Sequence, residues 1–391
     1  MLEFEYWWLL TLPLFFALGW LAARIDLDQL LSETRTLPAA YFKGLNFLIS
    51  EQHDKAIEAF TEAVEANSES LEIHFALGSL FRRRGEVDRA IRLHQKLLER
   101  PELPEPQKLA VLAELAQDYL KAGLLDRAEE LFRGLTDTRY RQHALRALLE
   151  IYIHEREWAR AITVTLELEQ LSGLPMRTEI AHFHCELAMQ ARLASDIATA
   201  RAELASALTV RQDCVRANLM LGEIEAEAGN HETAIAVWKR IELQRPQYLG
   251  LAAPQLLASF RASGKGAEGL ALLKSYLQKY NLPSVLNVVY EATLEDEGPD
   301  AAARLASDEL GRKPSLHILD RLLQAQALGG ESGQRKNYQL MQNAVHFFLG
   351  KTSSHCCDRC GFRARQYHWQ CPGCGGWETF APEPMESGAA S

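Results

Sequence analysis

The sequence lacks the short motifs that mark several common classes of enzyme. It has no Gly-x-Gly-x-x-Gly run after a predicted strand, no phosphate-binding P-loop, no nucleophile elbow and no His-Glu-x-x-His zinc motif. Without them, nothing in the chain predicts nucleotide-dependent, hydrolytic or zinc-protease chemistry. We therefore expect a protein that is not an enzyme and that has neither catalytic residues nor an organic cofactor.

Basic residues are also in short supply. The 391-residue chain has 42 Lys and Arg against 52 Asp and Glu, which gives a formal net charge of −10. Broad binding of nucleic acid depends on Lys and Arg side chains that neutralise phosphates. The deficit therefore argues against nucleic acid as a partner.

Long uncharged runs are rare, and the exception lies at the N-terminus. The run from Tyr6 to Ala23 comprises 18 residues without a charge, and a helix of that length rises about 27 Å, close to the thickness of a bilayer core. We expect residues 1–24 to form a single transmembrane anchor. Because Arg24 directly follows the run, the positive-inside rule places the bulk of the chain on the cytoplasmic side of the membrane.

Two alternatives remain open for this segment. A cleaved signal peptide begins with a positively charged region, whereas this chain begins with Glu3 and Glu5. A buried helix of a soluble protein is the second alternative.

Cysteine is sparse, with seven residues in the chain. Cys185, Cys214 and Cys356 are an odd, widely spaced set that does not fit a disulfide framework and favours a reducing compartment. The other four form two Cys-x-x-Cys pairs with ten residues between them: Cys357, Cys360, Cys371 and Cys374.

Two such pairs can surround one tetrahedral metal ion. Four thiolates suit Zn(II), or iron in a rubredoxin-type centre, and leave no ligand position open for chemistry. Gly361 and Gly375 follow the pairs and permit a tight turn that points backbone N–H groups at sulfur. His355 or His368 replacing a thiolate, a pair of disulfides, and chance spacing are the alternatives. We expect residues 355–380 to be a rubredoxin-like zinc ribbon whose aromatic residues form a small core or a contact surface: Phe362, Tyr367, Trp369 and Trp377.

Between residues 36 and 350 the chain repeats itself. A small residue is followed twelve residues later by alanine, and Gly44 and Gly78 lie 34 residues apart. This spacing is typical of tetratricopeptide repeats, in which two antiparallel helices cross where the small residues meet. The pattern is most regular in 36–277, and we expect it to continue through helices at about 284–295, 299–311, 315–328 and 335–349. The spaced pairs are Gly44 and Ala56, Gly78 and Ala90, Ala116 and Ala128, Ala188 and Ala200, and Gly222 and Ala234.

These repeats predict an all-α superhelical solenoid, with a generic helical bundle as the alternative. Stacked helix pairs of this kind form a concave groove that receives a peptide or a partner helix, so protein recognition is the expected activity. The small and polar residues 381–391 are expected to be a disordered tail.

Three other features have ordinary explanations. His182 and Cys185 share a helix face, but two ligands make a weak site, so we expect an ordinary helix surface. Cys185 and Cys214 are expected to be buried as small apolar residues. The basic run from Arg82 to Arg84 is expected to be a solvated helix end.

The order of these parts resembles the lipopolysaccharide assembly protein B family of Gram-negative bacteria over essentially the whole chain. The resemblance rests on three runs. These are Tyr-Phe-Lys-Gly-Leu-Asn-Phe-Leu at Tyr41–Leu48, Cys-Asp-Arg-Cys-Gly-Phe at Cys357–Phe362, and Trp-Gln-Cys-Pro-Gly-Cys at Trp369–Cys374, which is followed by Trp377.

The resemblance implies a non-enzymatic adaptor at the cytoplasmic face of the inner membrane. Members of the family promote degradation of the lipid A pathway deacetylase LpxC by the membrane protease FtsH, and other lipopolysaccharide-pathway proteins are further expected partners. The resemblance also implies that Cys357, Cys360, Cys371 and Cys374 hold one zinc or iron ion, and that the ribbon packs against the repeats.

Other functions remain as alternatives. The strongest is a general scaffold for the assembly of inner-membrane protein complexes. An electron carrier with iron in the ribbon, and an RNA-processing or transcription factor that uses Arg359, Arg363 and Arg365 of the ribbon, are weaker alternatives.

Overall fold

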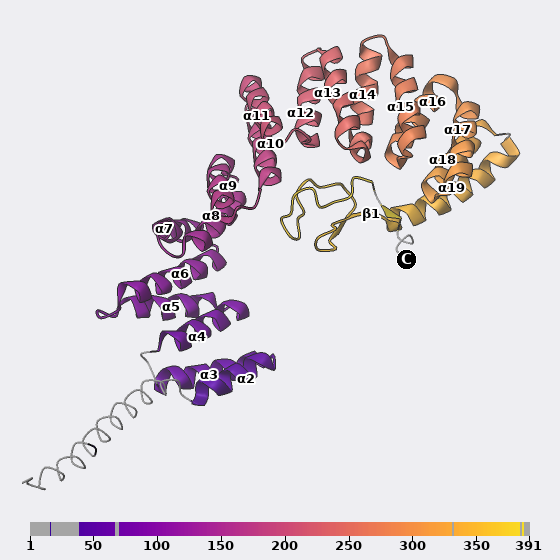
Figure 1. Cartoon of the computed structure of the whole chain (residues 1–391). Coiled ribbons are helices and arrows are strands. Elements are labelled where there is room, and N and C mark those ends of the chain that lie inside the picture. The colour runs from indigo at the N-terminus through magenta and orange to yellow at the C-terminus, as the bar shows by residue number, and fades with distance from the viewer. Residues whose placement is uncertain (1–15, 17–38, 67–69, 331, 384, 387–391) are drawn as a thin grey trace, which may run out of the picture. The chain divides into compact units, whose positions relative to one another are not determined.

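The protein is described by a computed structural model that places residues 16, 39–66, 70–330, 332–383 and 385–386 (Figure 1). The expected anchor at 1–24 lies outside these residues except for Phe16, and so do residues 387–391 of the tail. Within the described ranges, no helix combines the length and the apolar composition needed to cross a membrane.

The described array consists of helices that follow one another in antiparallel pairs, and the last four match the expected helices beyond residue 277. In chain order the helices are α2 (Ala39–Ile49), α3 (His53–Ala66), α4 (Leu71–Arg84), α5 (Val87–Leu98), α6 (Glu105–Lys121), α7 (Leu125–Gly134), α8 (Arg141–Glu155), α9 (Trp158–Ser172), α10 (Arg177–Leu193), α11 (Ile197–Val210), α12 (Val215–Glu227), α13 (His231–Gln244), α14 (Leu249–Ala262), α15 (Gly266–Tyr280), α16 (Pro283–Glu297), α17 (Pro299–Arg312), α18 (Leu316–Gly329) and α19 (Ser332–Thr352).

Small residues lie where the helices of a pair cross, as the twelve-residue spacing predicts. A Cβ atom added to Gly44 of α2 would lie 2.9 Å from the ring of Phe60 on α3. Gly222 of α12 faces the Trp238 indole of α13 in the same way, and that indole N–H donates to the Leu219 carbonyl at 3.2 Å. The alanines of the spaced pairs are fully buried: Ala56, Ala90, Ala128, Ala200 and Ala234. The tetratricopeptide prediction is therefore confirmed.

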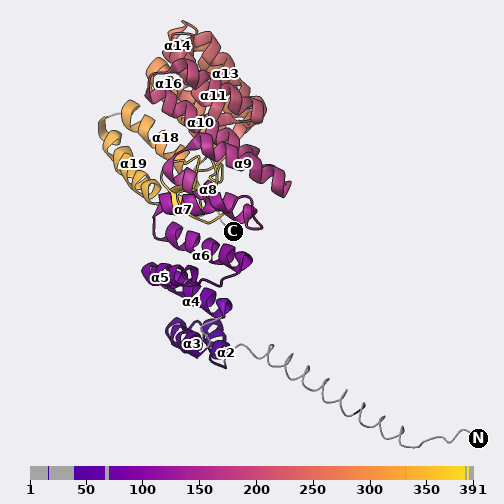
Figure 2. The ribbon, with the colours of Figure 1, turned by 90° about the vertical axis from the view of Figure 1, so that its left-hand side faces the viewer.

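The chain divides into two compact units, Met1–Glu155 and Arg156–Ser391. In the first unit, helices α2 to α7 stack in chain order (Figure 2). Its interior contains a polar cluster that the sequence did not predict. His94 of α5 and Asp118 of α6 are fully buried with their side chains 2.5 Å apart, and Arg82 of α4 donates to Asp118 at 2.7 Å. Arg82 is therefore part of the interior, not of a solvated helix end, whereas Arg83 is exposed as expected.

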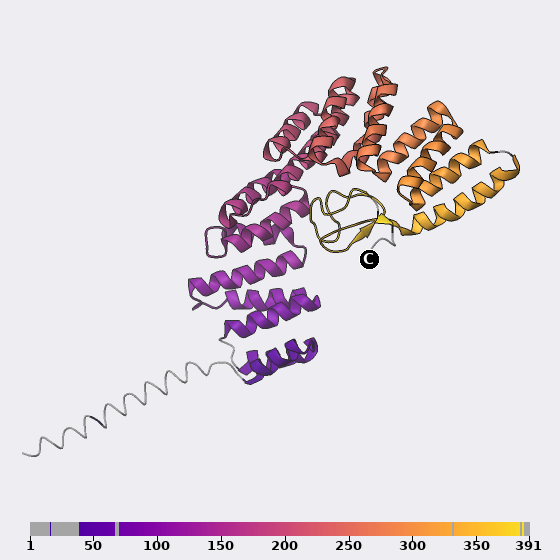
Figure 3. The same cartoon turned by 45° about the vertical axis from the view of Figure 1, so that its right-hand side comes forward.

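The second unit contains helices α9 to α19 and the four-cysteine ribbon, which lies beside the helices rather than at the end of the stack (Figure 3). Three short antiparallel strands run in the order β2-β1-β3: β1 (Ser353–Cys356), β2 (Arg363–Ala364) and β3 (Met385–Glu386). His355 pairs with Ala364, and Ser353 pairs with Glu386. The ribbon thus extends past residue 380 into the segment expected to be a disordered tail.

Candidate metal centre and its docking site

The four predicted cysteine ligands come together at one end of the ribbon. Their sulfur atoms all lie within 4.8 Å of one another. Cys357 and Cys374 are 3.8 Å apart, and Cys360 and Cys371 are 3.6 Å apart. Four bonds of about 2.3 Å around a tetrahedral Zn²⁺ place neighbouring sulfurs about 3.8 Å apart. The spacing of the four sulfurs therefore fits one ion.

Each Cys-x-x-Cys pair lies on a tight turn, as its glycine predicts. Gly361 and Gly375 have φ angles of 75° and 68°, in the left-handed region that glycine adopts without strain. The Gly361 N–H donates to the Cys357 carbonyl at 2.9 Å, and the Gly375 N–H donates to the Cys371 carbonyl at the same distance. The Gly373 N–H points at the Cys371 sulfur, 3.4 Å away. These turns hold the sulfurs in position for a shared ligand.

The surroundings of Cys357 and Cys360 shift the pKa values of these two thiols in opposite directions. Burial raises the pKa of Cys357, but a hydrogen bond with the Thr379 hydroxyl and hydrogen bonds from backbone N–H groups outweigh burial and lower the pKa to about 6. A backbone hydrogen bond lowers the pKa of Cys360, whereas burial and the neighbouring sulfurs raise it to about 12. Four thiolates within 4.8 Å of one another would repel, and a bound metal ion would supply the balancing positive charge.

The neighbouring residues that might replace a thiolate lie outside the cluster. The Cys356 sulfur is 3.9 Å from the Cys357 carbonyl oxygen and is not grouped with the four sulfurs. His355 bonds through Nδ1 to the Ala381 carbonyl oxygen at 2.9 Å. The His368 ring packs against Phe380. Among the described residues, only the four cysteines form a group that could hold a metal ion.

The aromatic residues of the ribbon divide between a core and a contact surface. Phe380, which the sequence analysis did not single out, is the buried aromatic residue packed with Cys357 and Cys371. Phe362 is exposed. The other three predicted aromatics contact the repeats, and two of these contacts are parallel stacks. Trp377 stacks on His182 of α10 with ring centroids 4.6 Å apart, and Trp369 stacks on Tyr248, just before α14, at 5.7 Å.

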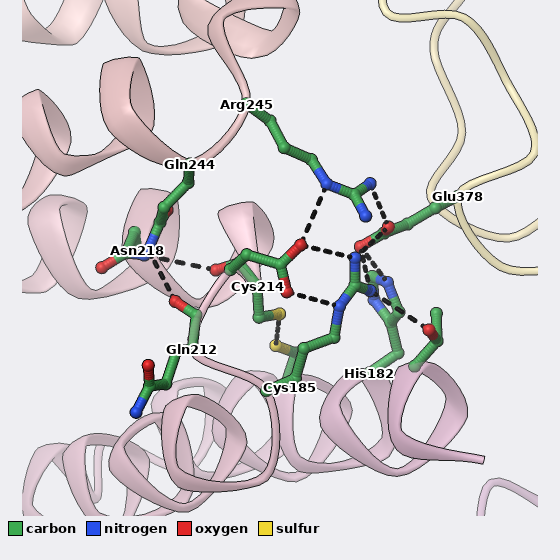
Figure 4. Close-up of polar contacts among 11 residues, drawn as sticks. His182, Cys185, Gln212, Cys214, Asn218, Gln244, Arg245 and Glu378 are labelled. Carbon is green, nitrogen blue, oxygen red and sulfur yellow. Dashed lines mark hydrogen bonds and ion pairs between the residues drawn. The ribbon is translucent and has the colours of Figure 1, made fainter. Parts of the chain in front are cut away.

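A single carboxylate, Glu378, joins the ribbon to the repeats (Figure 4). It accepts a hydrogen bond from Nη2 of Arg211 at 2.9 Å and one from Arg245 at 2.7 Å, and Nη1 of Arg211 forms an ion pair with its other oxygen at 2.9 Å. Nε2 of His182 lies 3.0 Å from Oε1 of Glu378. The Glu378 side chain is only 6% exposed, and its backbone has a φ angle of 52°, uncommon for a residue with a Cβ. Glu378 is thus held in one orientation and fully paired.

The ionisation of these groups follows from their contacts. Burial raises the pKa of Glu378, but hydrogen bonds from His182 and Arg211 outweigh burial and lower the pKa to about 2. Burial lowers the pKa of His182 more than Glu378 raises it, so the neutral imidazole donates its Nε2–H to an ionised carboxylate. Asp213 adds a second negative charge, 2.9 Å from Arg211 and 3.2 Å from Arg245. The two negative charges of Glu378 and Asp213 therefore balance the two positive charges of Arg211 and Arg245.

A second carboxylate of the ribbon anchors the segment that leads into β3. Glu383 accepts a hydrogen bond from the Ser284 backbone N–H, near the start of α16, at 3.2 Å, and it also contacts the Ser284 hydroxyl. Burial raises the pKa of Glu383 more than these bonds lower it. The ribbon therefore contacts the repeats of the second unit at α10, at the Arg211–Asp213 turn, near Tyr248 and at α16.

These contacts correct one expectation and confirm another. His182 is not on an ordinary helix surface, because it is fully buried beneath the ribbon. Cys185 and Cys214 are buried as predicted, with their sulfurs 4.0 Å apart. The sequence analysis missed Glu378, Arg211 and Arg245 as docking residues. Single charged residues carry no local signal, and the partners of Glu378 lie between 133 and 196 residues away in the chain.

Comparison with known proteins agrees with this architecture. Residues 355–382 match a family described as a rubredoxin metal binding domain, and residues 43–103, 114–173 and 185–248 match a tetratricopeptide repeat family. Lipopolysaccharide assembly protein B of Escherichia coli strain K12 is 33% identical over 95% of this chain and 97% of its own length. The protein of the same name from Haemophilus influenzae is 31% identical over the same shares of the two chains.

The matched length of these relatives spans most of the chain, repeats and ribbon together. The chain therefore belongs to the lipopolysaccharide assembly protein B family.

Proposed function

We propose that this chain is a membrane-tethered adaptor that regulates lipopolysaccharide synthesis by promoting degradation of LpxC by FtsH. The observation that carries the proposal is the closed sulfur cluster docked on the repeats. A site with four cysteine ligands has no free position for a substrate, so the metal would be structural. Lipopolysaccharide assembly is the process named for the relatives, and a repeat array offers surfaces for protein partners.

The ligands in this proposal are Cys357, Cys360, Cys371 and Cys374, and the ion is zinc or iron. The separation of their sulfurs and the two glycine turns support this assignment. When bound, the ion supplies the positive charge that four thiolates require. It would thereby hold the ribbon in the shape that presents Trp377 and Glu378 to the repeats.

The array would bring a protease and its substrate together. Residues 1–24 are proposed as a single membrane-spanning anchor with the remaining chain in the cytoplasm, and residues 36–350 as the partner-binding array. Confining the array to the membrane raises the effective concentration of a partner that is also in the membrane, without any new chemistry. In this proposal, an FtsH-type protease in the membrane and LpxC would both bind the anchored array and so come within reach of each other.

Reconstitution tests this proposal directly. FtsH and the full-length chain would be placed together in lipid nanodiscs, and the rate of LpxC cleavage measured with and without the chain. We expect faster cleavage when the chain is present and no acceleration when the chain is in separate nanodiscs. An unchanged rate in the shared nanodiscs would overturn the adaptor function and would favour a general scaffold for inner-membrane complexes.

A further inference from the structure

The last helix of the array, α19, has two apolar faces rather than one. The face toward α18 contains Tyr338, Val345 and Leu349, which are partly or fully buried and recur at helical spacing. A single buried face is what an outer helix of a repeat array needs, because terminal repeats normally present a polar outer surface to water.

The second apolar face of α19 is exposed. Leu340 is 61% exposed and Phe348 is 60% exposed, and Met341 and Phe347 are more than half exposed as well. At about 100° of rotation per residue these four side chains fall within an arc of about 120°. Ala344, also exposed, lies at the centre of that arc. We call these five residues the α19 stripe. A contiguous stripe of this kind marks a contact surface.

The charge of α19 distinguishes it from the rest of the chain. Its sequence from Ser332 to Thr352 contains Arg335, Lys336 and Lys351 and no Asp or Glu, whereas the chain as a whole has a net charge of −10. A second copy of α19 would bring like charges together and is disfavoured. The surface that complements this helix is apolar and anionic. A bilayer with anionic headgroups meets both requirements, because basic amphipathic helices lie in that interface.

We propose that α19 is a membrane-contacting helix whose stripe enters the headgroup region of an anionic bilayer, while Lys336, at the edge of the stripe, pairs with lipid phosphates. The inference rests on the membrane attachment in the proposed function and adds a second point of contact in the second unit of the chain. It assigns α19 a role outside both the metal centre and its docking contacts.

Photocrosslinking in defined bilayers tests this contact. A photoreactive benzoylphenylalanine would replace Leu340 or Phe348, one at a time, in the full-length chain in nanodiscs of equal parts phosphatidylglycerol and phosphatidylethanolamine. Leu243 of α13, 89% exposed, is the matched control position. We expect lipid adducts at positions 340 and 348 to exceed those at 243 by about fivefold or more, because Leu243 has basic neighbours in Lys239 and Arg240 but does not belong to an apolar stripe. Equal adducts at all three positions, adducts to a second copy, or no lipid adduct would overturn the proposal.

A charge variant separates contact with lipid from contact with an acidic protein helix. Lys336→Glu changes an exposed residue, and Lys239→Glu on α13 is its control. We expect Lys336→Glu to reduce lipid adducts at position 340 in the anionic nanodiscs, and Lys239→Glu to leave them unchanged. Equal lipid adducts in both variants would overturn the proposal, as would protein adducts that replace lipid adducts in native membranes. The reconstituted LpxC assay does not depend on this result, so the two proposals can fail separately.

Discussion

At the scale of single residues, the chain divides into positions that a local pattern predicts and positions that only the fold reveals. The four cysteines could be predicted because their ligand spacing is local, and each pair is followed by a glycine that the turn requires. Glu378 could not, since its partners Arg211, Arg245 and His182 come from helices and turns distant in sequence. His182 was misjudged for the same reason, because its burial depends on Trp377.

Glu378→Gln tests the docking carboxylate. The change keeps the shape of the side chain but leaves the Arg211 and Arg245 charges with Asp213 as their one remaining shared carboxylate. Breaking one side of a buried ion pair costs about 3 kcal/mol. We expect hydrogen exchange of residues 355–383 to report a local opening free energy lower by that amount. The control is Glu232→Gln, which removes an exposed pair with Lys265 and should leave stability nearly unchanged, because water screens such a pair. Equal effects of the two changes would contradict the role of Glu378.

The same contacts predict how docking depends on pH. The pKa of Glu378 falls from 4.5 to about 2 on docking. Its contribution to the stability of the docked ribbon is therefore complete above pH 4.5 and is lost as the pH falls toward 2. The pKa of His182 falls from 6.5, so protonation in the undocked state also opposes docking below pH 6.5. We therefore expect opening of the ribbon to become easier from pH 6.5 downward and more steeply below 4.5. Hydrogen exchange corrected for intrinsic rates at each pH would measure this, and greater protection at pH 4 than at pH 7 would contradict it.

At the scale of elements, the ribbon has too little apolar interior to fold alone. Its buried cluster consists of Cys357, Cys371 and Phe380. Small units of this kind depend on a metal, whose apparent binding free energy is about 10–16 kcal/mol in zinc-finger peptides. We expect Cys371→Ser to release the ion and to expose residues 355–383 to rapid hydrogen exchange.

Cys356→Ser is the matched control for the metal prediction, because Cys356 adjoins the cluster without joining it. Elemental analysis should find one ion per chain in this variant and less than one in Cys371→Ser. A red protein would contain iron and a colourless one zinc. A full complement of metal in Cys371→Ser would contradict the ligand assignment.

The close packing of the repeats predicts a steric effect of substitution at the points where paired helices cross. Gly222 has no room for a Cβ, because the Trp238 indole occupies the crossing point of α12 and α13. Inserting a methyl group into such a contact costs about 1–3 kcal/mol. Gly134→Ala, in α7, meets nothing within 4 Å and should be neutral or slightly stabilising. Thermal unfolding followed by circular dichroism should show a lower midpoint for Gly222→Ala only. A shift of the same size in both variants would argue against the crossing geometry.

At the scale of the whole molecule, the order of the parts was the most predictable property. Repeat spacing and cysteine spacing are periodic or local signals, so the all-helical array and the ribbon follow from them. The side of the array on which the ribbon docks depends on contacts between segments far apart in the sequence, and the exposed stripe of α19 depends on which face of that helix packs on α18. The predicted C-terminal end of the ribbon, residue 380, was too early, because β3 (Met385–Glu386) pairs with β1. This two-residue strand has no strong strand pattern of its own in the sequence.

The half-life of LpxC in cells tests the central claim, that a tethered adaptor controls the stability of this enzyme. Pulse-chase labelling would compare a strain that makes the full-length chain with one that makes the chain without residues 1–24 at the same level. Because tethering acts through effective concentration, we expect a severalfold longer LpxC half-life without the anchor, while the array remains folded. An unchanged half-life would contradict the account.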